Sequence, residues 1–237
     1  MPQKRNIVLI LQAFGLGDVI WSQSIAHYFL EKGYRVMWPV EDHYFDGCMR
    51  AYPKIQFMPK SLTEPSLFEI KEKVIVHGIE ISPIRWSNSY MKVPYKDVMR
   101  AKYDMYDLDW RSWKNHAMWM SDEKEQTELL KILGIKYGDK YNLVNKRFGT
   151  NAERSVEIQC NNGLRNIEMT EIEGYSLFDW TPVITGAMEI HTVSTAILFM
   201  LEMLPLAQPI HLYCRKPIEQ NFNYVDYIFT KKYNLHL

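Results

Sequence analysis

The sequence predicts an α/β protein, a compact chain of two Rossmann-like α/β/α halves that face a common cleft. Apolar, strand-like segments alternate with helical segments through residues 6–80, and the same alternation begins again near residue 140. The segment between them is helical and rich in aromatic residues. We therefore expect an N-terminal half at residues 1–105, a helical linker at 106–138 and a C-terminal half at 139–237. The cleft between two such halves is a natural ligand site.

The composition argues against several other classes of protein. The chain has 237 residues, of which 47% are hydrophobic, so it can bury a core and is not expected to be disordered. Basic and acidic residues number 28 each, a balance that gives no long-range attraction to nucleic acid, so no nucleic-acid partner is expected. No apolar run approaches the roughly 20 residues of a membrane helix, and no transmembrane segment is expected.

The cysteines indicate a cellular compartment rather than a site. Cys48, Cys160 and Cys214 are widely spaced and form neither a CxxC pair nor a zinc-binding pattern. We expect free thiols in a reducing compartment, which indicates a cytoplasmic protein. The sequence does not indicate the oligomeric state.

The first half opens with a β-α-β unit. Residues 6–12, NIVLILQ, are apolar on both faces, as in the central strand of a parallel sheet. Residues 18–33 carry apolar side chains at helical spacing and end in Lys32 and Gly33, which are typical of a helix C-terminus. A second strand follows, with a right-handed crossover expected. A short helix and two further strands, at residues 54–58 and 73–80, complete this half.

The linker and the second half continue the pattern. Ser121 is expected to cap a linker helix that stops at Gly134. Trp110, Trp113 and Trp119 are expected to pack in a core or between the halves rather than to bind a ligand. The second half is expected to contain strands at residues 140–149, 165–172 and 209–216, helices at 176–187 and within 189–205, and a short strand or helix at 224–229.

Gly15 and Gly17 lie in a turn between the first strand and its helix, where dinucleotide-binding folds carry G-x-G-x-x-G. The third position of that motif is Ile20 here, and Asp18 would compete with a pyrophosphate for the positive end of the helix. Two roles stay open for Asp18. It caps the helix N-terminus, or it faces a cleft as a base that accepts a proton from a substrate hydroxyl.

Hydroxyl groups gather in the second half, where a long apolar helix is expected to begin. Thr192, Ser194 and Thr195 are more hydroxyls than one helix cap requires, and hydroxyls beside free N–H groups bind anions. His191 is a candidate donor to phosphate, and Glu189 is a candidate acceptor from sugar or ribose hydroxyls. The alternative is one cap among solvated hydroxyls with a structural histidine.

Lys146 and Arg147 follow the first strand of the second half. Paired cations at the carboxyl end of a strand can neutralise a diphosphate, and the alternative is a solvated loop. Together with the hydroxyl-rich segment, they indicate a nucleoside-diphosphate leaving group opposite a carboxylate base.

At these residues the sequence resembles a GT-B glycosyltransferase, in particular the heptosyltransferase-like group, family 9. In that group the first strand ends in a G-x-G-D-V-type turn, which Gly15, Gly17, Asp18 and Val19 match. The donor half of the family carries a basic residue after its first strand and a hydroxyl-rich segment that opens a helix. This chain is shorter than most members and resembles the short GT-B domains of phages and large viruses. Where the donor helix of the family usually carries D-T/S-G, this chain has the sequence VSTA at residues 193–196.

The resemblance implies an inverting, metal-independent transfer of a sugar from a nucleotide-diphosphate donor to a hydroxyl of a glycan or glycoconjugate acceptor. Asp18 would be the catalytic base, with Gly15, Gly17 and Trp21 on the acceptor side. No cofactor and no metal are expected, and the D-x-D sequence at residues 107–109 lies in the linker rather than after a strand. The donor-binding residues would be Lys146, Arg147, Glu189, His191, Thr192, Ser194 and Thr195.

Two other functions stay open from the sequence. An NAD(P)-binding oxidoreductase would use the first β-α-β unit, with Glu41 or Asp42 holding a ribose. A non-catalytic nucleotide- or sugar-binding protein would keep the same site and leave Asp18 idle. The sugar, the nucleotide and the acceptor are not identified by these patterns.

Overall fold

The computed structural model describes residues 6–11, 15–85, 97–148, 151–213 and 228–236. The chain divides into two compact units, Met1–Met120 and Ser121–Leu237. Each unit contains a five-stranded sheet, which confirms the prediction of two α/β halves. The expected linker at 106–138 is divided between the units, because η3 (Trp110–Asn115) packs on α2 (Gln23–Glu31) in unit 1 and α7 (Glu123–Ile132) packs on helices of unit 2.

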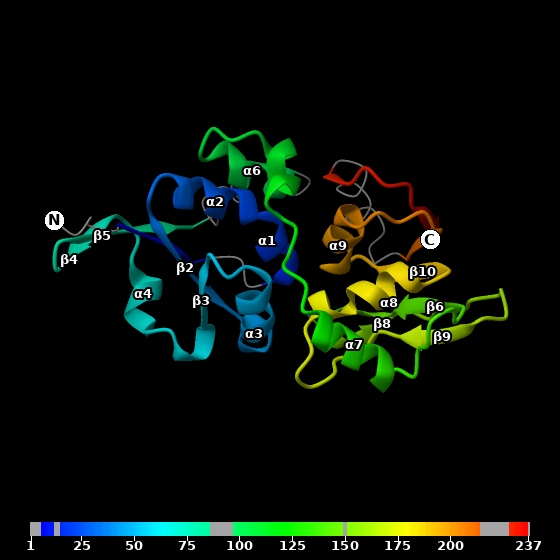
Figure 1. Ribbon diagram of the computed structural model, residues 1–237. Helices are drawn as coiled ribbons and strands as arrows, with labels where there is room; N and C mark the ends of the chain where they lie inside the picture. Colours follow the sequence, from blue (N-terminus) through cyan, green and yellow to red (C-terminus); the bar gives the residue numbers. More distant parts are fainter. Residues whose placement is uncertain (1–5, 12–14, 86–96, 149–150, 214–227, 237) are drawn as a thin grey trace. The chain divides into compact units, whose positions relative to one another are not determined.

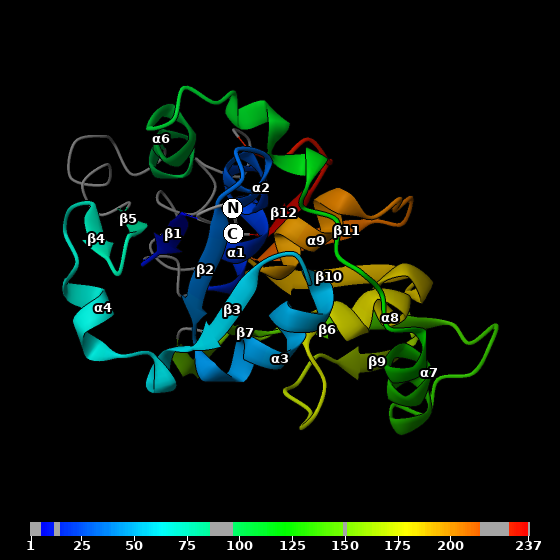
Figure 2. The ribbon, with the colours of Figure 1, turned by 60° about the vertical axis from the view of Figure 1, so that its left-hand side comes forward.

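Unit 1 is built on a mainly parallel sheet, whose strands β1, β2 and β3 lie side by side in Figure 2. Val8, Leu9 and Ile10 of β1 are buried, as expected for a central strand. The strands run in the order β3 (Gln56–Pro59), β2 (Arg35–Val40), β1 (Ile7–Ile10), β5 (Ile79–Ile84) and β4 (Val74–Val76), with only β4 antiparallel to its neighbour.

The prediction of a single strand at residues 73–80 is wrong. The chain there forms a hairpin of β4 and β5, which turns at His77 and Gly78 with φ angles of 47° and 75°. Positive φ at both central residues is the requirement of a type I′ hairpin turn, and glycine meets it without steric cost. The apolar run therefore belongs to two strands rather than one.

The helix expected at residues 18–33 consists of two helices, α1 (Leu16–Trp21) and α2, which meet at Ser22. The expected C-terminal stop at Lys32 and Gly33 is confirmed, because Gly33 has a φ of 82° and its N–H donates to the Leu30 carbonyl oxygen. Within its described residues, unit 1 also contains, besides η3, the helices α3 (Asp42–Ala51), η1 (Lys60–Leu62), α4 (Pro65–Glu69) and α6 (Val98–Asp104).

Aromatic residues form part of the core of unit 1. Trp21 lies 5.1 Å from Trp113 and 6.3 Å from Trp110, measured between ring centroids. Trp113 and Trp119 are buried, which confirms the prediction that these side chains pack in a core.

Unit 2 is built on a sheet in the order β12 (Asn234–His236), β11 (Ile210–Tyr213), β10 (Glu189–Val193), β6 (Tyr141–Asn145) and β9 (Arg165–Glu168), with all neighbours parallel. Figure 1 labels β10, β6 and β9. A separate hairpin joins β7 (Arg147–Phe148) to β8 (Asn151–Ser155). The strand expected at 209–216 is described only as far as Tyr213, and most of the element expected at 224–229 lies outside the described residues.

The helices of unit 2 differ from the expectation in three places. The cap of α7 is Asp122 rather than Ser121, because its carboxylate accepts from the Lys124 and Glu125 backbone N–H groups. The helix expected at 176–187 is a 3₁₀ turn, η4 (Leu177–Trp180), followed by α8 (Thr181–Gly186). The long helix expected within 189–205 is the seven-residue α9 (Ile197–Met203). Within the described residues, no helix has the length and apolar character needed to cross a bilayer.

Alternation along the strands gives the sheet of unit 2 two different faces. One carries Leu143, Ile190 and Leu212, and α8 covers it, since the Tyr141 hydroxyl on this face donates to the Val183 carbonyl oxygen at 2.9 Å. Parallel sheets usually bury apolar residues on both faces. Register partners on the opposite face, here named the polar face, include Asn142, Asn166, Glu189, His191, His211, Tyr213 and His236.

Candidate functional site

Asp18 lies in the first turn of α1 rather than at its cap. Gly15 is the N-cap, and its carbonyl oxygen accepts from the Asp18 and Val19 backbone N–H groups at 3.0 and 3.2 Å. A side chain at Gly15 would come within 3.5 Å of the Asp18 carboxylate. The capping role considered for Asp18 is therefore wrong, although a carboxylate in the first turn still interacts favourably with the helix dipole. Gly17 belongs to α1 itself, so the glycine turn is shorter than expected.

The carboxylate of Asp18 forms an ion pair with Lys102 of α6, within unit 1. The Lys102 side chain is fully buried, whereas 32% of the Asp18 side chain is exposed. An ammonium group in a protein interior needs an opposite charge beside it, because its desolvation is otherwise far too costly. Asp18 supplies that charge and still reaches solvent through its exposed part. This arrangement suits a base, but it also gives Asp18 a structural role.

Trp21, expected on the acceptor side, is fully buried. Its indole N–H donates to the Met99 carbonyl oxygen at 2.8 Å, and its own carbonyl oxygen accepts from the Tyr103 hydroxyl at 2.5 Å. Both bonds connect α1 to the region of α6 that carries Lys102. Because the indole has no exposed surface, its role in this structure is packing.

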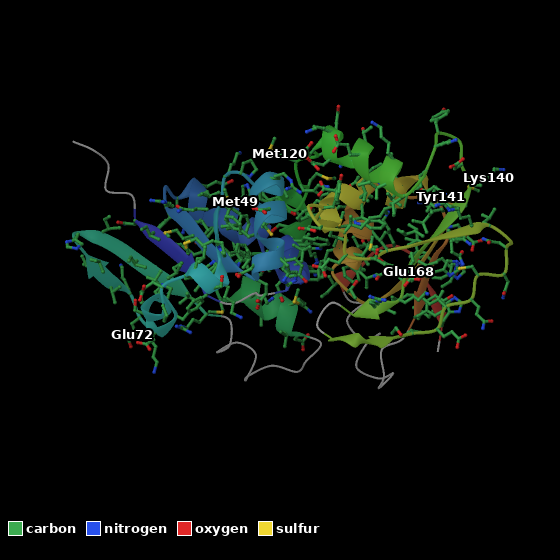
Figure 3. The ribbon with its side chains drawn as sticks, turned by 90° about the horizontal axis from the view of Figure 1, so that it is seen from below. Met49, Glu72, Met120, Lys140, Tyr141 and Glu168 are labelled. Carbon is green, nitrogen blue, oxygen red and sulfur yellow. The ribbon has the colours of Figure 1, made fainter. Side chains whose placement is uncertain are left out.

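In unit 2, Lys146 follows β6 and makes an ion pair with Glu168 of β9, whose oxygen lies 2.6 Å from the lysine nitrogen. Figure 3 labels Glu168 on β9 and Tyr141 at the start of β6. Both side chains are partly exposed, at 34% for Lys146 and 38% for Glu168. Arg147 is exposed at the start of β7. The two expected cations thus lie at the carboxyl end of β6.

A hydroxyl cluster lies at the carboxyl ends of β6 and β10. The Asn145 amide nitrogen is 3.0 Å from the Thr192 hydroxyl and 3.2 Å from the Thr195 hydroxyl. Thr192 belongs to β10, and Ser194 and Thr195 lie between β10 and α9. The expectation that all three hydroxyls open a helix is therefore wrong, because Thr192 lies within the strand near its end and Ser194 and Thr195 follow it. Asn145 was not a candidate from the sequence, because only the pairing of β6 with β10 shows that it faces Thr192.

Glu189 and His191 lie on the polar face, opposite the face of Thr192. The structure thus divides the seven expected donor-binding residues between the two faces and the strand end. The Glu189 carboxylate is 3.1 Å from the His191 Nε2 atom and 3.9 Å from the His211 Nε2 atom. His211 was not a candidate from the sequence, and its histidine-to-histidine register with His191 is visible only in the sheet.

Burial lowers the pKa of both His191 and His211 below its ordinary value, and neighbouring imidazoles add to the effect. Partial burial opposes ionisation of Glu189, but hydrogen bonds from Asn162 and His191 outweigh it and lower the pKa of that carboxyl group. The polar face therefore carries a carboxylate beside two neutral imidazoles at neutral pH.

Comparison with solved structures identifies the fold. An iron-containing dodecameric glycosyltransferase from enterotoxigenic Escherichia coli, TibC, matches 99% of this chain with a TM-score of 0.52 and 12% identity. A family 9 glycosyl transferase from Veillonella parvula matches 98% of this chain and 85% of its own, with a TM-score of 0.54 and 8% identity. This chain has the GT-B-type fold of these proteins.

This chain matches only part of the length of TibC. TibC was also solved with ADP-D-beta-D-heptose, and that structure matches with a TM-score of 0.51 and 12% identity. The present chain spans 62% and 58% of the length of the two TibC chains. No protein-family model and no curated protein sequence matches it.

The Asp18–Lys102 pair leads to a prediction about stability. Replacing Asp18 by Asn removes the carboxylate that pairs with the buried ammonium, and we expect the free energy of unfolding to fall by about 3 kcal/mol. The double variant Asp18→Asn/Lys102→Met removes both charges and is expected to recover most of that loss. Urea unfolding followed by tryptophan fluorescence measures both.

The control is Glu168→Gln, which removes one partner of an exposed pair and is expected to cost less than about 1 kcal/mol. An Asp18→Asn variant no less stable than this control would contradict a structural role for the pair.

The neutral histidines lead to a prediction about pH. Their pKa values are lower in the folded than in the unfolded chain, so the unfolded chain binds more protons below the ordinary value of 6.5. The contribution of these two histidines to stability is therefore fully present above pH 6.5, and it is lost as the pH falls below that value. We expect the urea midpoint, measured with a chelator present, to be lower at pH 5.5 than at pH 7.5. Replacing both His191 and His211 by Gln should reduce this difference, whereas replacing the exposed His43 should not.

Proposed function

We propose that this chain is a glycosyltransferase that moves a sugar from a nucleoside-diphosphate donor to a hydroxyl of a glycan or glycoconjugate. The observation that carries the proposal is the fold, which the family 9 glycosyl transferase from Veillonella parvula matches along 98% of this chain. The position of Asp18 in the first turn of α1, the helix that follows β1, supports it, as does the G-x-G-D-V sequence there. We also propose that the reaction inverts the anomeric configuration and uses no metal in the transfer step.

In the proposed mechanism, Asp18 acts as general base. The acceptor oxygen attacks the anomeric carbon while its proton passes to the Asp18 carboxylate, and the bond from that carbon to the diphosphate oxygen breaks. The Lys102 ammonium stays beside the carboxylate during this step. We expect proton transfer to accompany bond formation rather than to precede it.

In the same proposal, groups at the carboxyl ends of β6 and β10 stabilise the diphosphate. Lys146 and Arg147 supply positive charge, and Asn145 positions the hydroxyls of Thr192 and Thr195. The Lys146 ion pair with Glu168 is partly exposed, and such pairs contribute only about 0.2–1 kcal/mol. Lys146 can therefore exchange Glu168 for a phosphate oxygen at little cost. Preorganised donors of this kind stabilise charge that develops on a leaving group.

One observation favours a second candidate function. Because Asp18 already neutralises a buried lysine, its carboxylate has a reason to be present without any chemistry. A non-catalytic protein that binds a nucleotide or sugar would keep this pair, and Asp18 would then be structural.

The free thiols Cys48 and Cys160 suit the reducing, cytoplasmic setting that we propose for either function.

If Asp18 is the base, a variant that lacks its carboxylate but still folds should lose turnover. The double variant Asp18→Asn/Lys102→Met should fold, and it should release nucleoside diphosphate from the donor about 100- to 10,000-fold more slowly than the wild type, because a general base contributes on that scale. Lys102→Met alone keeps the carboxylate and serves as the matched control. Equal turnover in the single and double variants, within twofold, would show that Asp18 is structural.

Lys146 as a diphosphate ligand predicts a change in donor affinity. Lys146→Ala should weaken binding of the nucleoside diphosphate by about tenfold or more, the loss of a charge-assisted hydrogen bond. Titration calorimetry measures this directly. Glu168→Gln, which frees Lys146 from its ion pair, should bind at least as tightly as the wild type. Weaker binding by Glu168→Gln would indicate that the pair itself, rather than the free lysine, supports the site.

A further inference from the structure

Three side chains from two neighbouring strands converge on the polar face of unit 2. Glu189 and His191 are two residues apart on β10, and His211 is the register partner of His191 on β11. The two imidazole rings stack with centroids 4.4 Å apart and planes 6° apart. One ligand atom from each of the three residues lies within 4.8 Å of the others, the one such group of three or more His, Cys, Asp or Glu side chains in the described part of the chain.

The spacing of these atoms suits a metal ion. Both Nε2 atoms face the same Glu189 oxygen, at 3.1 Å for His191 and 3.9 Å for His211. Imidazole nitrogens and carboxylate oxygens bind Zn²⁺ at about 2.0–2.2 Å, and tetrahedral geometry then holds them about 3.4 Å apart. The two distances lie on either side of this value. Because the imidazole planes are only 6° apart, the rings must turn relative to each other for both nitrogens to point at one ion.

A further contact engages the Nδ1 atom of each imidazole. The Nδ1 atom of His191 is 3.0 Å from the Tyr213 hydroxyl, and the Nδ1 atom of His211 is 2.8 Å from the His236 Nε2 atom. With Nδ1 engaged, each ring presents Nε2 to Glu189. Metal-binding histidines are commonly fixed through their second nitrogen in this way.

The exposure of the three side chains provides an entry path. His191 is nearly buried, with 5% of its side chain exposed, whereas Glu189 and His211 are 30% and 21% exposed. An ion can therefore approach from the side of Glu189 and His211 and reach His191 last. Three protein ligands leave a further coordination position for water.

We propose that Glu189, His191 and His211 form a binding site for a divalent transition-metal ion of the zinc type. Two imidazoles and one carboxylate favour Zn²⁺, Co²⁺, Ni²⁺ or Fe²⁺ over Mg²⁺ and Ca²⁺, which prefer oxygen ligands. The ion would link β10 to β11 on the polar face. This site is separate from the proposed transfer step, in which no metal takes part, and it gives Glu189 and His191 a role other than donor binding.

The test is a metal titration of the full chain without a polyhistidine tag, stripped with chelator and then dialysed. Calorimetry with ZnCl₂ is expected to give a stoichiometry near one ion per chain, and MgCl₂ is expected to give no binding. No nucleotide is present, so the result is independent of the proposed transferase activity. Zinc binding that is absent, or no stronger than that of the His211→Ala variant, would overturn the proposal.

Matched variants separate the site from other histidines. Glu189→Gln and His211→Ala should each lose binding by at least about 100-fold. His236→Ala removes the contact to Nδ1 of His211 and the ring stacked on Tyr213, and it should weaken binding about 10- to 100-fold. His43→Ala, on the exposed surface of α3, should bind as the wild type does. If His211→Ala fails to fold by circular dichroism, His211→Asn takes its place. Equal loss in His43→Ala would also overturn the proposal.

Discussion

The ion pair between Asp18 and Lys102 is the constraint on which the candidate base depends. A lysine with no exposed surface must have its charge balanced, and Asp18 provides the balance from the first turn of α1. The bonds that Trp21 makes with Met99 and Tyr103 join the same two segments. The position of the carboxylate is therefore set by the core of unit 1 rather than by a flexible turn. A fixed carboxylate that is partly open to solvent is what a general base requires, and it is also what a structural counter-charge requires.

Unit 2 distributes its polar groups according to strand ends and faces. The Asn145 hydroxyl cluster lies where β6 and β10 end, and open parallel sheets bind ligands at this edge. The polar face carries a second group of titratable side chains on the opposite side from α8. Two chemically different sites can therefore coexist on one small sheet. The strand end suits an anion, and the polar face suits a cation.

The sequence predicted what depends on neighbours in the chain. The apolar run at β1, the stop at Gly33 and the burial of Trp113 all follow from local pattern and side-chain type. The turn at His77 and Gly78 was missed because a histidine at positive φ has no simple sequence signal. The cap at Asp122 was missed because Ser121 is an equally good capping residue.

The site was less predictable for a different physical reason. Lys102 is 84 residues from Asp18, and Asn145 is 47 residues from Thr192, so neither contact leaves a periodic pattern in the sequence. His211 joins His191 only through the register of two parallel strands. Candidate residues could be predicted by type, since Asp18 and Lys146 follow strands in the sequence and Thr192 lies near the end of one. Their partners required the fold.

The most direct measurement is a thermal-shift comparison of the purified chain with UDP, GDP, ADP, dTDP and CMP beside NAD⁺ and NADP⁺. A ligand that binds only the folded chain raises its melting temperature by mass action. The account predicts a selective rise with one nucleoside diphosphate, which would also name the nucleotide of the donor. A rise with NAD⁺ or NADP⁺ alone would contradict it and assign the Gly15–Asp18 turn to a dinucleotide.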